Sequence, residues 1–453
     1  MGKKYNFDYI IIGGGPAGHT IAFNLAKTKK RVALIEENII NDNFTSRDIP
    51  YATSLDFAHT FFKFDHYPET NGQDLHYNFP TIVAHQNAVI NSFLTEQKTL
   101  LEKSNITHIE GHAHFLDPHT IAVNDVQYSS DNFILATGSE LKTAGISGLE
   151  AAEYFTPATA IRIRRLPKYA LVIGGGPTGC EIASYYAELG AKVIILEKES
   201  RLLPREDTET SACLSEYFTH ELGALVITNA EVIAIEEDNV SKQVIYTIDK
   251  QEKSIRIDNI ILATGFKPRT DCGLENAGVK VKPTGAVATN KLFQTSAKNI
   301  YAIGDCLGNE SSTERAEYQA SLLSSNLLKK SKSLPNYHGF ARVTNTYPEI
   351  ATVGFTETRL TKLKRKYKKS IVYFKDLPIS KITRSSYGFV KILADRKNHI
   401  IGATIVAPNA GLMIGELSVA VRHHLTVLEI TGTPHVANDY PLAIKLAAKN
   451  LIK

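Results

Sequence analysis

The chain contains the same glycine-rich loop twice, and each copy lies between a short apolar run and a helical stretch. The first copy covers residues 13–18 (GGGPAG) and the second covers residues 174–179 (GGGPTG). In a strand, loop and helix of this pattern, the first glycine allows a tight turn, the second lets the backbone approach a pyrophosphate, and the third lets the helix pack closely on the strand. The residues predicted to fill these roles are Gly13, Gly15 and Gly18 in the first loop and Gly174, Gly176 and Gly179 in the second.

A carboxylate follows each loop at the same distance. The spacing from the first glycine is 23 residues in both copies (36 − 13 and 197 − 174), where Glu36 and Glu197 end a second apolar run. This spacing is close to the roughly 20 residues at which an acidic side chain binds the ribose of a dinucleotide. One glycine-rich loop alone is weak evidence, because such turns occur in many folds. The repeated order of strand, loop, helix, strand and acid predicts an α/β fold with two Rossmann-like nucleotide-binding domains.

Length and composition exclude several other classes of protein. At 453 residues the chain is long enough for about three domains, and its 43% apolar and 22% charged residues are ordinary globular values. The 51 basic and 47 acidic residues leave a net charge of only +4, and the densest basic cluster, residues 362–369, is read as a solvated helix end or loop. We therefore expect no nucleic-acid partner. No apolar run reaches the roughly 18 residues of a membrane span, and the N-terminus enters a strand without a signal segment, which predicts a cytoplasmic protein.

Three further motifs extend the nucleotide-binding pattern. The apolar runs 133–136 and 260–263 each stop at a Thr-Gly turn, which in the first case ends at Gly138, and the run 299–304 stops at Asp305. In this order the motifs resemble those of the pyridine nucleotide-disulfide oxidoreductases, the group that contains dihydrolipoamide dehydrogenase, glutathione reductase, mercuric reductase and soluble transhydrogenase. The resemblance covers nearly the whole chain.

The resemblance implies a three-part subunit. The implied parts are an FAD-binding domain split between residues 1–150 and 267–334, an NAD-binding domain at residues 151–266, and a C-terminal α+β dimerisation domain at residues 335–453. The last region contains the segments 344–354 and 388–393, which resemble the domain that pairs two subunits in this family. A homodimer is therefore implied by analogy.

The resemblance assigns the first loop to FAD. Glu36 is expected to bind the adenosine ribose of FAD, and Asp305 is expected to bind the ribityl chain of the flavin. A helix N-cap is the alternative role for Asp305. Gly138, at the turn that ends its strand, is placed among the cofactor-binding residues.

The resemblance assigns the second loop to a nicotinamide nucleotide. Glu181 matches a family glutamate that lies near the nicotinamide and flavin N5, and it is the predicted catalytic residue. A surface acid in the first helical turn is the alternative. Glu197 predicts NADH rather than NADPH, because a carboxylate accepts bonds from the ribose hydroxyls and repels a 2′-phosphate. Lys198 and Arg201 are the residues that could instead swing towards such a phosphate.

The chain departs from the family at the redox-active cysteines. Asn43 and Asp48 occupy the positions of the family's Cys-x4-Cys pair, and Ala52 replaces the lysine that pairs with the Glu181 position. Arg47 is either a substitute for that lysine or, as we favour, a solvated surface residue. Without a thiolate the chain has no nucleophile for exchange with a disulfide. The chain's four cysteines stand singly, without metal-binding spacing, as is usual in a reducing compartment: Cys180, Cys213, Cys272 and Cys306.

The family's acid–base dyad is missing as well. With the segment 443–448 as the anchor, Ala437 and Leu442 occupy the positions of the histidine and glutamate that the partner subunit contributes in the family. His435 lies two residues early, and a register that includes it puts Tyr440 at the acid position. The joint loss of the thiols and the dyad favours direct transfer of reducing equivalents from the flavin to an acceptor.

These features predict an FAD-dependent NAD(P)H oxidoreductase that prefers NADH as its donor. Hydride would pass from NADH to the flavin and then to a small-molecule, non-disulfide electron acceptor, as in quinone reductases and diaphorases. The alternatives are a soluble pyridine nucleotide transhydrogenase or an NADH oxidase and, in another class, a catalytically weak redox sensor or partner-binding flavoprotein. Cys306, beside Asp305, is the remaining candidate for a redox thiol, although a buried structural cysteine is the favoured interpretation. No metal site is predicted.

Overall fold

The computed structural model describes residues 5–37, 48–65, 78–143, 145–237, 242–257, 259–308, 312–329 and 331–452. Asn43 and Arg47 lie outside these residues, as do the side chains of Asp48 and Ala52. The chain folds into two compact units. The first comprises Met1–Tyr51, Ala84–Lys142 and Phe266–Asn336, and the second comprises Ala52–Val83, Thr143–Gly265 and Tyr337–Lys453.

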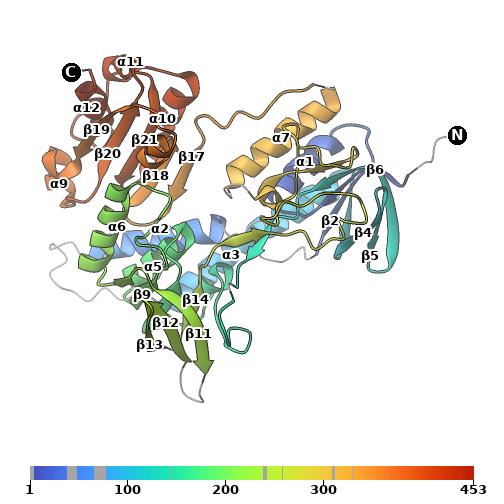
Figure 1. The fold of residues 1–453 in the computed structure, drawn as a ribbon, viewed down its shortest axis with the longest axis horizontal. Helices are drawn as coiled ribbons and strands as arrows, with labels where there is room; N and C mark the ends of the chain where they lie inside the picture. The colour runs from blue at the N-terminus through green and yellow to red at the C-terminus, as the bar shows by residue number, and fades with distance from the viewer. Residues whose placement is uncertain are drawn as a thin grey trace. The chain divides into compact units, whose positions relative to one another are not determined.

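The first unit is built on a largely parallel sheet (Figure 1), and its parallel strands are strongly apolar. Such strands are typical of a sheet that is covered on both faces. The helices α1 and α7 pack on each other, and α1 also contacts β1 and β2. The parallel strands lie in the order β3-β2-β1-β6, and β16 pairs with β6 on the other side. The bounds are β1 (Phe7–Ile12), α1 (Pro16–Ala26), β2 (Val32–Glu36), α3 (Phe79–Lys103), β3 (Ile106–Glu110), β6 (Val126–Leu135), β16 (Ile300–Ala302) and α7 (Thr313–Lys329).

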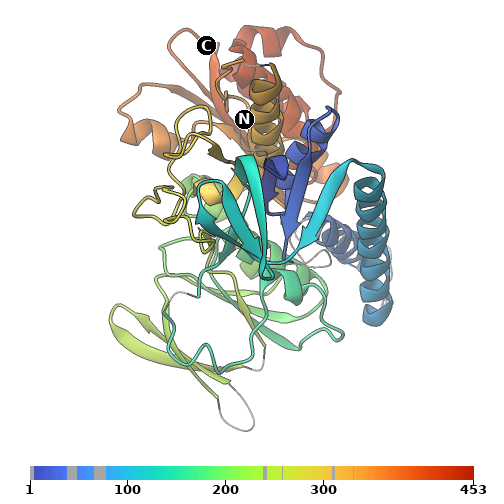
Figure 2. The same ribbon diagram turned by 90° about the vertical axis from the view of Figure 1, so that its right-hand side faces the viewer.

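An antiparallel meander extends this sheet beyond β6 (Figure 2). It consists of β6, β5 (Thr120–Val123) and β4 (Ala113–Asp117). A separate antiparallel pair, β7 (Ser139–Leu141) and β15 (Phe266–Pro268), lies where the chain leaves and re-enters the unit. Because β1, β6 and β16 are parallel, their carboxyl ends meet at one edge of the sheet. The segments that follow these three strands therefore lie close together, and they carry the first glycine loop, Gly138 and Asp305.

The second unit begins with another parallel sheet, in the order β10-β9-β8-β14. The helix α5 follows β8 directly, as α1 follows β1, and the helix α2 (Asp48–Asp65) joins this unit from Ala52 onward. A three-stranded antiparallel sheet accompanies the parallel one. The bounds are α4 (Pro157–Ala160), β8 (Tyr169–Ile173), α5 (Pro177–Glu188), β9 (Lys192–Leu196), α6 (Thr208–His220), β10 (Leu225–Ile227), β11 (Glu231–Glu237), β12 (Lys242–Ile248), β13 (Gln251–Ile257) and β14 (Ile260–Leu262).

The C-terminal part of the second unit is a five-stranded antiparallel sheet in the order β17-β18-β21-β20-β19. Its apolar core is shared with α10 and α12. The two parallel sheets with their helices, together with this antiparallel sheet, confirm the predicted α/β fold class. None of the described helices combines the length and apolar character needed to cross a bilayer. The bounds are β17 (Ala341–Thr344), β18 (Glu349–Gly354), α8 (Glu357–Lys362), β19 (Lys368–Tyr373), α9 (Pro378–Thr383), β20 (Phe389–Ala394), β21 (Ile400–Ala407), α10 (Ala410–His423), α11 (Val427–Gly432) and α12 (Leu442–Asn450).

Candidate nucleotide-binding and redox site

Gly13 and Gly18 form the close junction between β1 and α1. Gly13 has a φ of +109°, and a Cβ atom there would collide with the carbonyl oxygen of Ala136. A Cβ atom on Gly18 would collide with the carbonyl oxygen of Gly13. Both collisions are with backbone atoms of the sheet and its turn. Any larger residue at either position would therefore push α1 away from the sheet.

Gly15 has a different role from the other two glycines. Its backbone lies in an ordinary region (φ −72°, ψ −176°), and no atom lies within 4 Å of a Cβ built on it. Gly15 is the N-cap of α1, no described side chain caps this end, and the first helical bond runs from the His19 N–H to the Gly15 oxygen at 3.0 Å. The N–H groups of the first turn and the positive end of the helix dipole therefore face open space, as in a pyrophosphate site.

The second loop repeats this geometry in the second unit. Gly174 has a φ of +110°, and a Cβ atom on it would collide with the carbonyl oxygen of Ala263. A Cβ atom on Gly179 would collide with Gly174. Gly176, the N-cap of α5, has a φ of −72° and a ψ of −178°, and open space again lies where its Cβ would be. Each unit thus offers one helix end that fits a dinucleotide pyrophosphate.

Glu36 ends β2, and its carboxylate lies against the backbone of Gly14. The Nε2 atoms of His19 and His108 lie 3.9 and 3.6 Å from Glu36 Oε2. Burial raises the pKa of the Glu36 carboxyl, but hydrogen bonds and charge from His108 and His19 outweigh burial and lower the pKa below its ordinary value. An ionised carboxylate at this place can accept bonds from ribose hydroxyls. The two histidines were not predicted, because they come from α1 and β3 rather than from the loop motif.

Asp305 lies in the short 3-10 helix η2 (Gly304–Leu307) that follows β16, inside the turn rather than at its N-cap. Its Oδ2 atom accepts a hydrogen bond from Ser139 Oγ at 3.0 Å. Ser139 directly follows Gly138, which has a φ of +71°. A Cβ atom on Gly304 would lie 3.4 Å from the Cβ of Ala17, so this turn borders the start of α1. The predicted FAD-binding residues of three separate segments are thus brought to one edge of the sheet.

Glu197 ends β9 and has only 5% of its surface exposed. One carboxylate oxygen accepts a hydrogen bond from the Gly175 N–H, and the other accepts one from the Glu199 N–H at 2.7 Å. These bonds hold the carboxylate against the second loop, much as Glu36 lies against the first. The acid therefore stands beside the loop, where the ribose of a bound dinucleotide would lie.

Arg201 was predicted as an alternative ligand for a 2′-phosphate. Its guanidinium group is instead hydrogen-bonded within its own loop. Its guanidinium group donates to the carbonyl oxygens of Pro204 at 3.3 Å and Glu206 at 3.2 Å. It also donates to Thr208 Oγ1 at 3.5 Å. Arg201 would have to break these bonds to reach a phosphate, whereas the exposed Lys198 would not.

Glu181 follows the first turn of α5 and is half-buried. Its Oε1 atom accepts two hydrogen bonds from Asn345, one from the backbone N–H at 2.8 Å and one from Nδ2 at 3.1 Å. The turn between β17 and β18 thus holds this half-buried carboxylate by two hydrogen bonds. Asn345, which is 164 residues away along the chain, was not predicted from the sequence.

Comparison with known proteins identifies the family to which this chain belongs. Residues 7–320 match the family described as pyridine nucleotide-disulphide oxidoreductase. The chain belongs to this family. Residues 340–444 match the dimerisation domain of the same family. The resemblance predicted from the motifs is therefore confirmed, and the family is one of flavin-dependent oxidoreductases that use FAD and NAD(P)H.

Relatives with different activities cover most of this oxidoreductase. A mercuric reductase from Staphylococcus aureus is 29% identical over 98% of this chain and 82% of its own length. A soluble pyridine nucleotide transhydrogenase from Vibrio cholerae is 30% identical over 88% of this chain and 86% of its own length. Among solved structures, the Cu(II) complex of RclA, an HOCl-induced flavoprotein disulfide reductase from Escherichia coli, covers 100% of both chains with a TM-score of 0.88 at 24% identity. This structural likeness shows the fold.

His435 of the oxidoreductase has a carboxylate partner that was not predicted from the sequence. Its Nε2 atom lies 3.0 Å from Glu416 Oε1 on α10, and its Nδ1 atom lies 2.9 Å from the carbonyl oxygen of Thr433. The His435 side chain is only 4% exposed. A histidine–glutamate pair therefore exists in this region, at positions other than Ala437 and Leu442.

All four cysteines lie among the described residues, and none of them forms a disulfide. The Cys306 thiol is fully buried and donates to the carbonyl oxygen of Ile303 at 3.2 Å. Burial raises the pKa of Cys306 to about 12, of Cys272 to about 12 and of Cys213 to about 11. Burial also raises the pKa of Cys180 well above its ordinary value. These groups are thiols at neutral pH, and thiols are poor nucleophiles.

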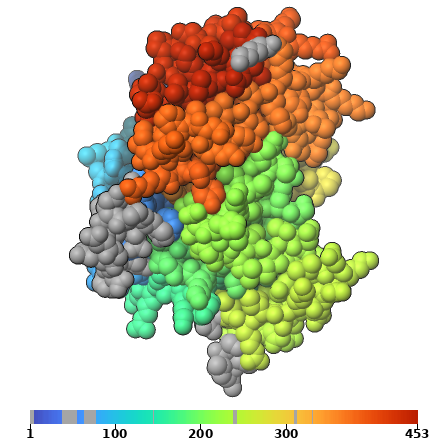
Figure 3. Space-filling view, turned by 90° about the vertical axis from the view of Figure 1, so that its left-hand side faces the viewer, coloured from blue at the N-terminus to red at the C-terminus, as the bar shows by residue number. Residues whose placement is uncertain are grey.

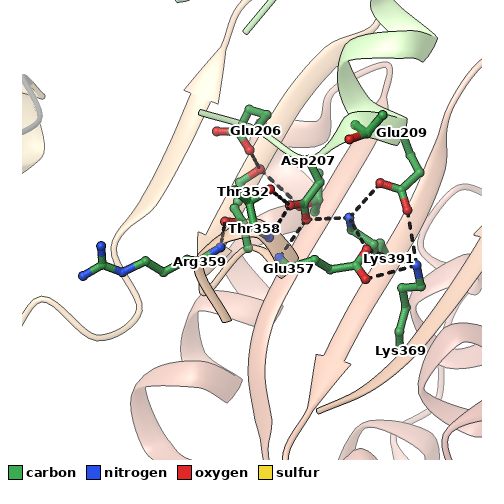
Figure 4. A network of polar contacts seen from close by, with 12 residues as sticks. Glu206, Asp207, Glu209, Thr352, Glu357, Thr358, Arg359, Lys369 and Lys391 are labelled. Atoms are coloured by element: carbon green, nitrogen blue, oxygen red, sulfur yellow. Dashed lines mark hydrogen bonds and ion pairs between the residues drawn. The ribbon is translucent and has the colours of Figure 1, made fainter. Parts of the chain in front are cut away.

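A buried ion-pair network joins the start of α6 in the second unit to the C-terminal sheet of the same unit (Figure 4). Lys391 on β20 has a fully buried side chain, and its Nζ atom lies 2.6 Å from Asp207 Oδ2. The same Nζ atom lies 3.1 Å from Glu357 Oε1 and 3.5 Å from Glu209 Oε2. These four residues form what we call the Lys391 cluster. Its single ammonium group connects the start of α6, the start of α8 and the strand β20.

Neighbouring hydrogen bonds strengthen this junction. Asp207 accepts bonds from the N–H groups of Glu357 and Thr358 at the start of α8, both at 3.0 Å. Glu206 accepts a bond from Thr352 Oγ1 at 2.8 Å. In Figure 3 the green segments near residue 210 lie directly against the orange C-terminal segments. The loop that follows β9 is therefore anchored to the C-terminal sheet.

Proposed function

We propose that this oxidoreductase transfers hydride from NADH to FAD, and that a small non-disulfide acceptor, with a quinone as the first candidate, reoxidises the flavin. The state of the cysteines carries the proposal, because burial keeps all four as thiols. Disulfide exchange needs a thiolate that can reach its substrate, and in the register that the resemblance implies, Asn43 and Asp48 stand where the family has its cysteine pair. A quinone accepts reducing equivalents without a sulfur relay.

The residues of the first unit fit FAD. The uncapped end of α1 at Gly15 would receive the pyrophosphate, Glu36 would accept bonds from the adenosine ribose, and Asp305 would accept bonds from the ribityl hydroxyls. Ser139 orients the Asp305 carboxylate by donating to one of its oxygens. Bound FAD supplies the hydride acceptor, flavin N5. The contribution of these residues is to bind the cofactor and fix its orientation.

The residues of the second unit fit a nicotinamide nucleotide. Gly176 leaves the end of α5 open for the pyrophosphate, and Glu197 stands beside the loop for the ribose. Glu181 is the proposed catalytic residue, which orients the nicotinamide. Its carboxylate accepts hydrogen bonds from the two donors of Asn345, which would hold it in place.

We expect NADH to be preferred over NADPH, and Glu197→Arg to reverse this preference. The substitution removes the repulsion of a 2′-phosphate and supplies a cation, so the ratio of kcat/KM for NADH over NADPH should fall by at least about tenfold, equivalent to about 1.4 kcal/mol. Steady-state kinetics with both nucleotides measures the ratio. Glu199→Arg, with the same charge change two residues away, should leave the ratio near the wild-type value. A wild type that prefers NADPH would show that the acid rule fails here and that Lys198 binds the phosphate.

Anaerobic titration of the yellow protein tests the proposed route. We expect one NADH, and therefore two electrons, to reduce each FAD, without a long-wavelength thiolate-to-flavin absorption band. Lipoamide and oxidised glutathione should not be turned over, whereas menadione should be. Cys306→Ser should not change the electron count. A requirement of four electrons with such a band would show that a cysteine pair takes part, and direct transfer would then be wrong.

A transhydrogenase is the second candidate, because a soluble pyridine nucleotide transhydrogenase is among the relatives at 30% identity. In that reaction the reoxidant of the flavin is a second nicotinamide nucleotide bound at the same loop. Reduction of a thionicotinamide analogue of NAD by NADPH, measured beside quinone reduction by NADH, distinguishes the two activities. The faster reaction identifies the acceptor class.

We also propose the assembly and location of the protein. The subunit would have three parts: an FAD domain (residues 1–150 and 267–334), an NAD domain (151–266) and a dimerisation domain (335–453). The match to a dimerisation domain supports a homodimer. Leu412 and Val419 of α10, 84% and 54% exposed, add an apolar surface of the kind that interfaces cover. Cysteines without disulfides support a cytoplasmic location.

A further inference from the structure

Three polar side chains lie on one face of α5, at Glu181, Ser184 and Glu188. Their spacing of three and then four residues places them in a line along the helix. Glu181 accepts two hydrogen bonds from Asn345, and Ser184 Oγ accepts one from the Tyr347 N–H at 3.2 Å. The turn between β17 and β18, residues 345–347, is therefore attached to α5 at two points.

Glu188 completes this line with a buried ion pair. Its side chain is fully buried, and its two oxygens accept hydrogen bonds from Ser184 Oγ and His59 Nδ1. An ionised carboxylate in such surroundings requires a compensating positive charge. The His59 ring, on α2, also lies 5.5 Å from the Tyr347 ring. His59 thus contacts the 345–347 turn directly through its ring. It is also linked to the turn through the hydrogen bonds of Glu188 and Ser184.

The surroundings of His59 favour its charged form. Burial lowers its pKa, but the charge and hydrogen bond of Glu188 outweigh burial, and Glu349 and Asp56 add to the same effect, so the pKa of His59 is raised. These carboxylates come from α5, β18 and α2, and the Tyr347 ring faces the imidazole from the turn. The charged pair is complete below about pH 6.5, the ordinary pKa of histidine. It is lost as the pH rises through the higher pKa of the folded state.

We propose that His59 is a positioning residue for Glu181, acting through Glu188, Ser184 and the 345–347 turn. This inference rests on the proposed function, in which Glu181 lies beside the nicotinamide. Without the positive charge, Glu188 is left uncompensated in the interior and must bind a proton or move. Ser184 then loses the acceptor that orients its hydroxyl, and the turn loses its attachment to α5. The Glu181 carboxylate in turn loses its fixed donors, and hydride transfer slows.

The test compares three variants of the full-length, FAD-loaded protein with one control. His59→Leu removes both the donor and the charge. His59→Asn keeps an N–H donor close to the position of Nδ1 but cannot carry a charge. Glu188→Gln removes the acceptor charge. The control is His399→Asn, because His399 forms a similar pair with Asp395 at 3.1 Å on the turn between β20 and β21.

Stopped-flow reduction of the flavin by NADH, from about pH 6 to about pH 10, provides the functional measurement. The limiting rate of the wild type should fall as the pH rises through the pKa of His59. His59→Leu and Glu188→Gln should be roughly tenfold slower than the wild type at the acidic end, without that transition. His59→Asn should be intermediate in rate and equally insensitive to pH, and His399→Asn should follow the wild type. The KM for NADH should change less than the limiting rate, because the loop and Glu197 are intact.

Hydrogen exchange gives a measurement that is independent of activity. The amides of Asn345 and Tyr347 are bonded to Glu181 and Ser184, so a peptide covering residues 341–349 should exchange faster in His59→Leu than in the wild type. Wild-type exchange and a wild-type pH profile in the variants would overturn this inference while the proposed function stands. If NADH does not reduce the wild-type flavin at all, the proposed function fails, and the exchange data still decide whether His59 supports the turn.

Discussion

The Gly15→Val variant should purify as a folded protein with at least about tenfold less FAD than the wild type, equivalent to a loss of about 1.4 kcal/mol or more in binding. A Cβ atom at this position meets no atom within 4 Å, and the φ of −72° is ordinary, so the fold tolerates a side chain there. The added side chain instead fills the space through which a pyrophosphate approaches the end of α1. The ratio of flavin absorbance to protein, with circular dichroism to confirm folding, measures the effect.

The second loop provides the matched control for this prediction. Gly176→Val should keep its FAD but should not be reduced by NADH, because the same open space is filled in the other unit. Gly13→Val should fail to fold properly, since its Cβ would collide with the Ala136 carbonyl. Full flavin content in Gly15→Val would show that the first loop is not the FAD site.

Replacing Lys391 by methionine should lower the free energy of unfolding by about 3–5 kcal/mol, because it leaves Asp207, whose side chain is 2% exposed, buried without its cation. Urea denaturation followed by circular dichroism measures the change. Lys369→Met is the matched control. Lys369 contacts Glu209 at 3.3 Å and Glu357 at 3.0 Å, but 40% of its side chain is exposed, so its loss should cost less than about 1 kcal/mol.

The effect of Lys391→Met should depend on pH in a definite direction. Burial raises the pKa of Asp207, but the Lys391 hydrogen bond and charge and the N–H donors of α8 outweigh burial and lower that pKa. The stability from this pair is therefore present above about pH 3.9, the ordinary pKa of aspartate, and is lost as the pH falls through the lower folded value. The difference between wild type and variant should be steady near neutral pH and shrink in acid. Equal stability of the two proteins at neutral pH would contradict the role of the cluster.

Local spacing was sufficient to predict which acidic side chains lie beside the two glycine loops. Glu36 and Glu197 were placed beside their loops by a 23-residue interval (36 − 13 and 197 − 174), because that interval corresponds to one helix and one return strand. The same reasoning identified the open position at Gly15 and Gly176. It worked because the determining contacts are between atoms that are close in the sequence.

Partners from distant segments could not be predicted in this way. Ser139 and Asp305 are separated by 166 residues, and Asn345 and Glu181 by 164. Such contacts depend on which strand ends and turns meet in space, and the spacing within a motif does not encode that. The role of Arg201 could not be predicted for another reason, because its long side chain could reach either a phosphate or its own loop. Only the path of the backbone shows that its guanidinium group donates to carbonyl oxygens of its own loop.

The near-identical geometry of the two loops has a consequence for how long each ligand stays bound. Their N-cap dihedral angles are −72°, −176° and −72°, −178°, so the two loops offer a pyrophosphate the same backbone geometry. A flavin cofactor must remain bound through many turnovers, whereas the nicotinamide nucleotide must leave after each one. The difference in residence time must therefore come from contacts outside the loops. At the proposed FAD site Asp305 would add a second anchor, whereas at the proposed nicotinamide site both oxygens of Glu197 are already bonded to backbone N–H groups.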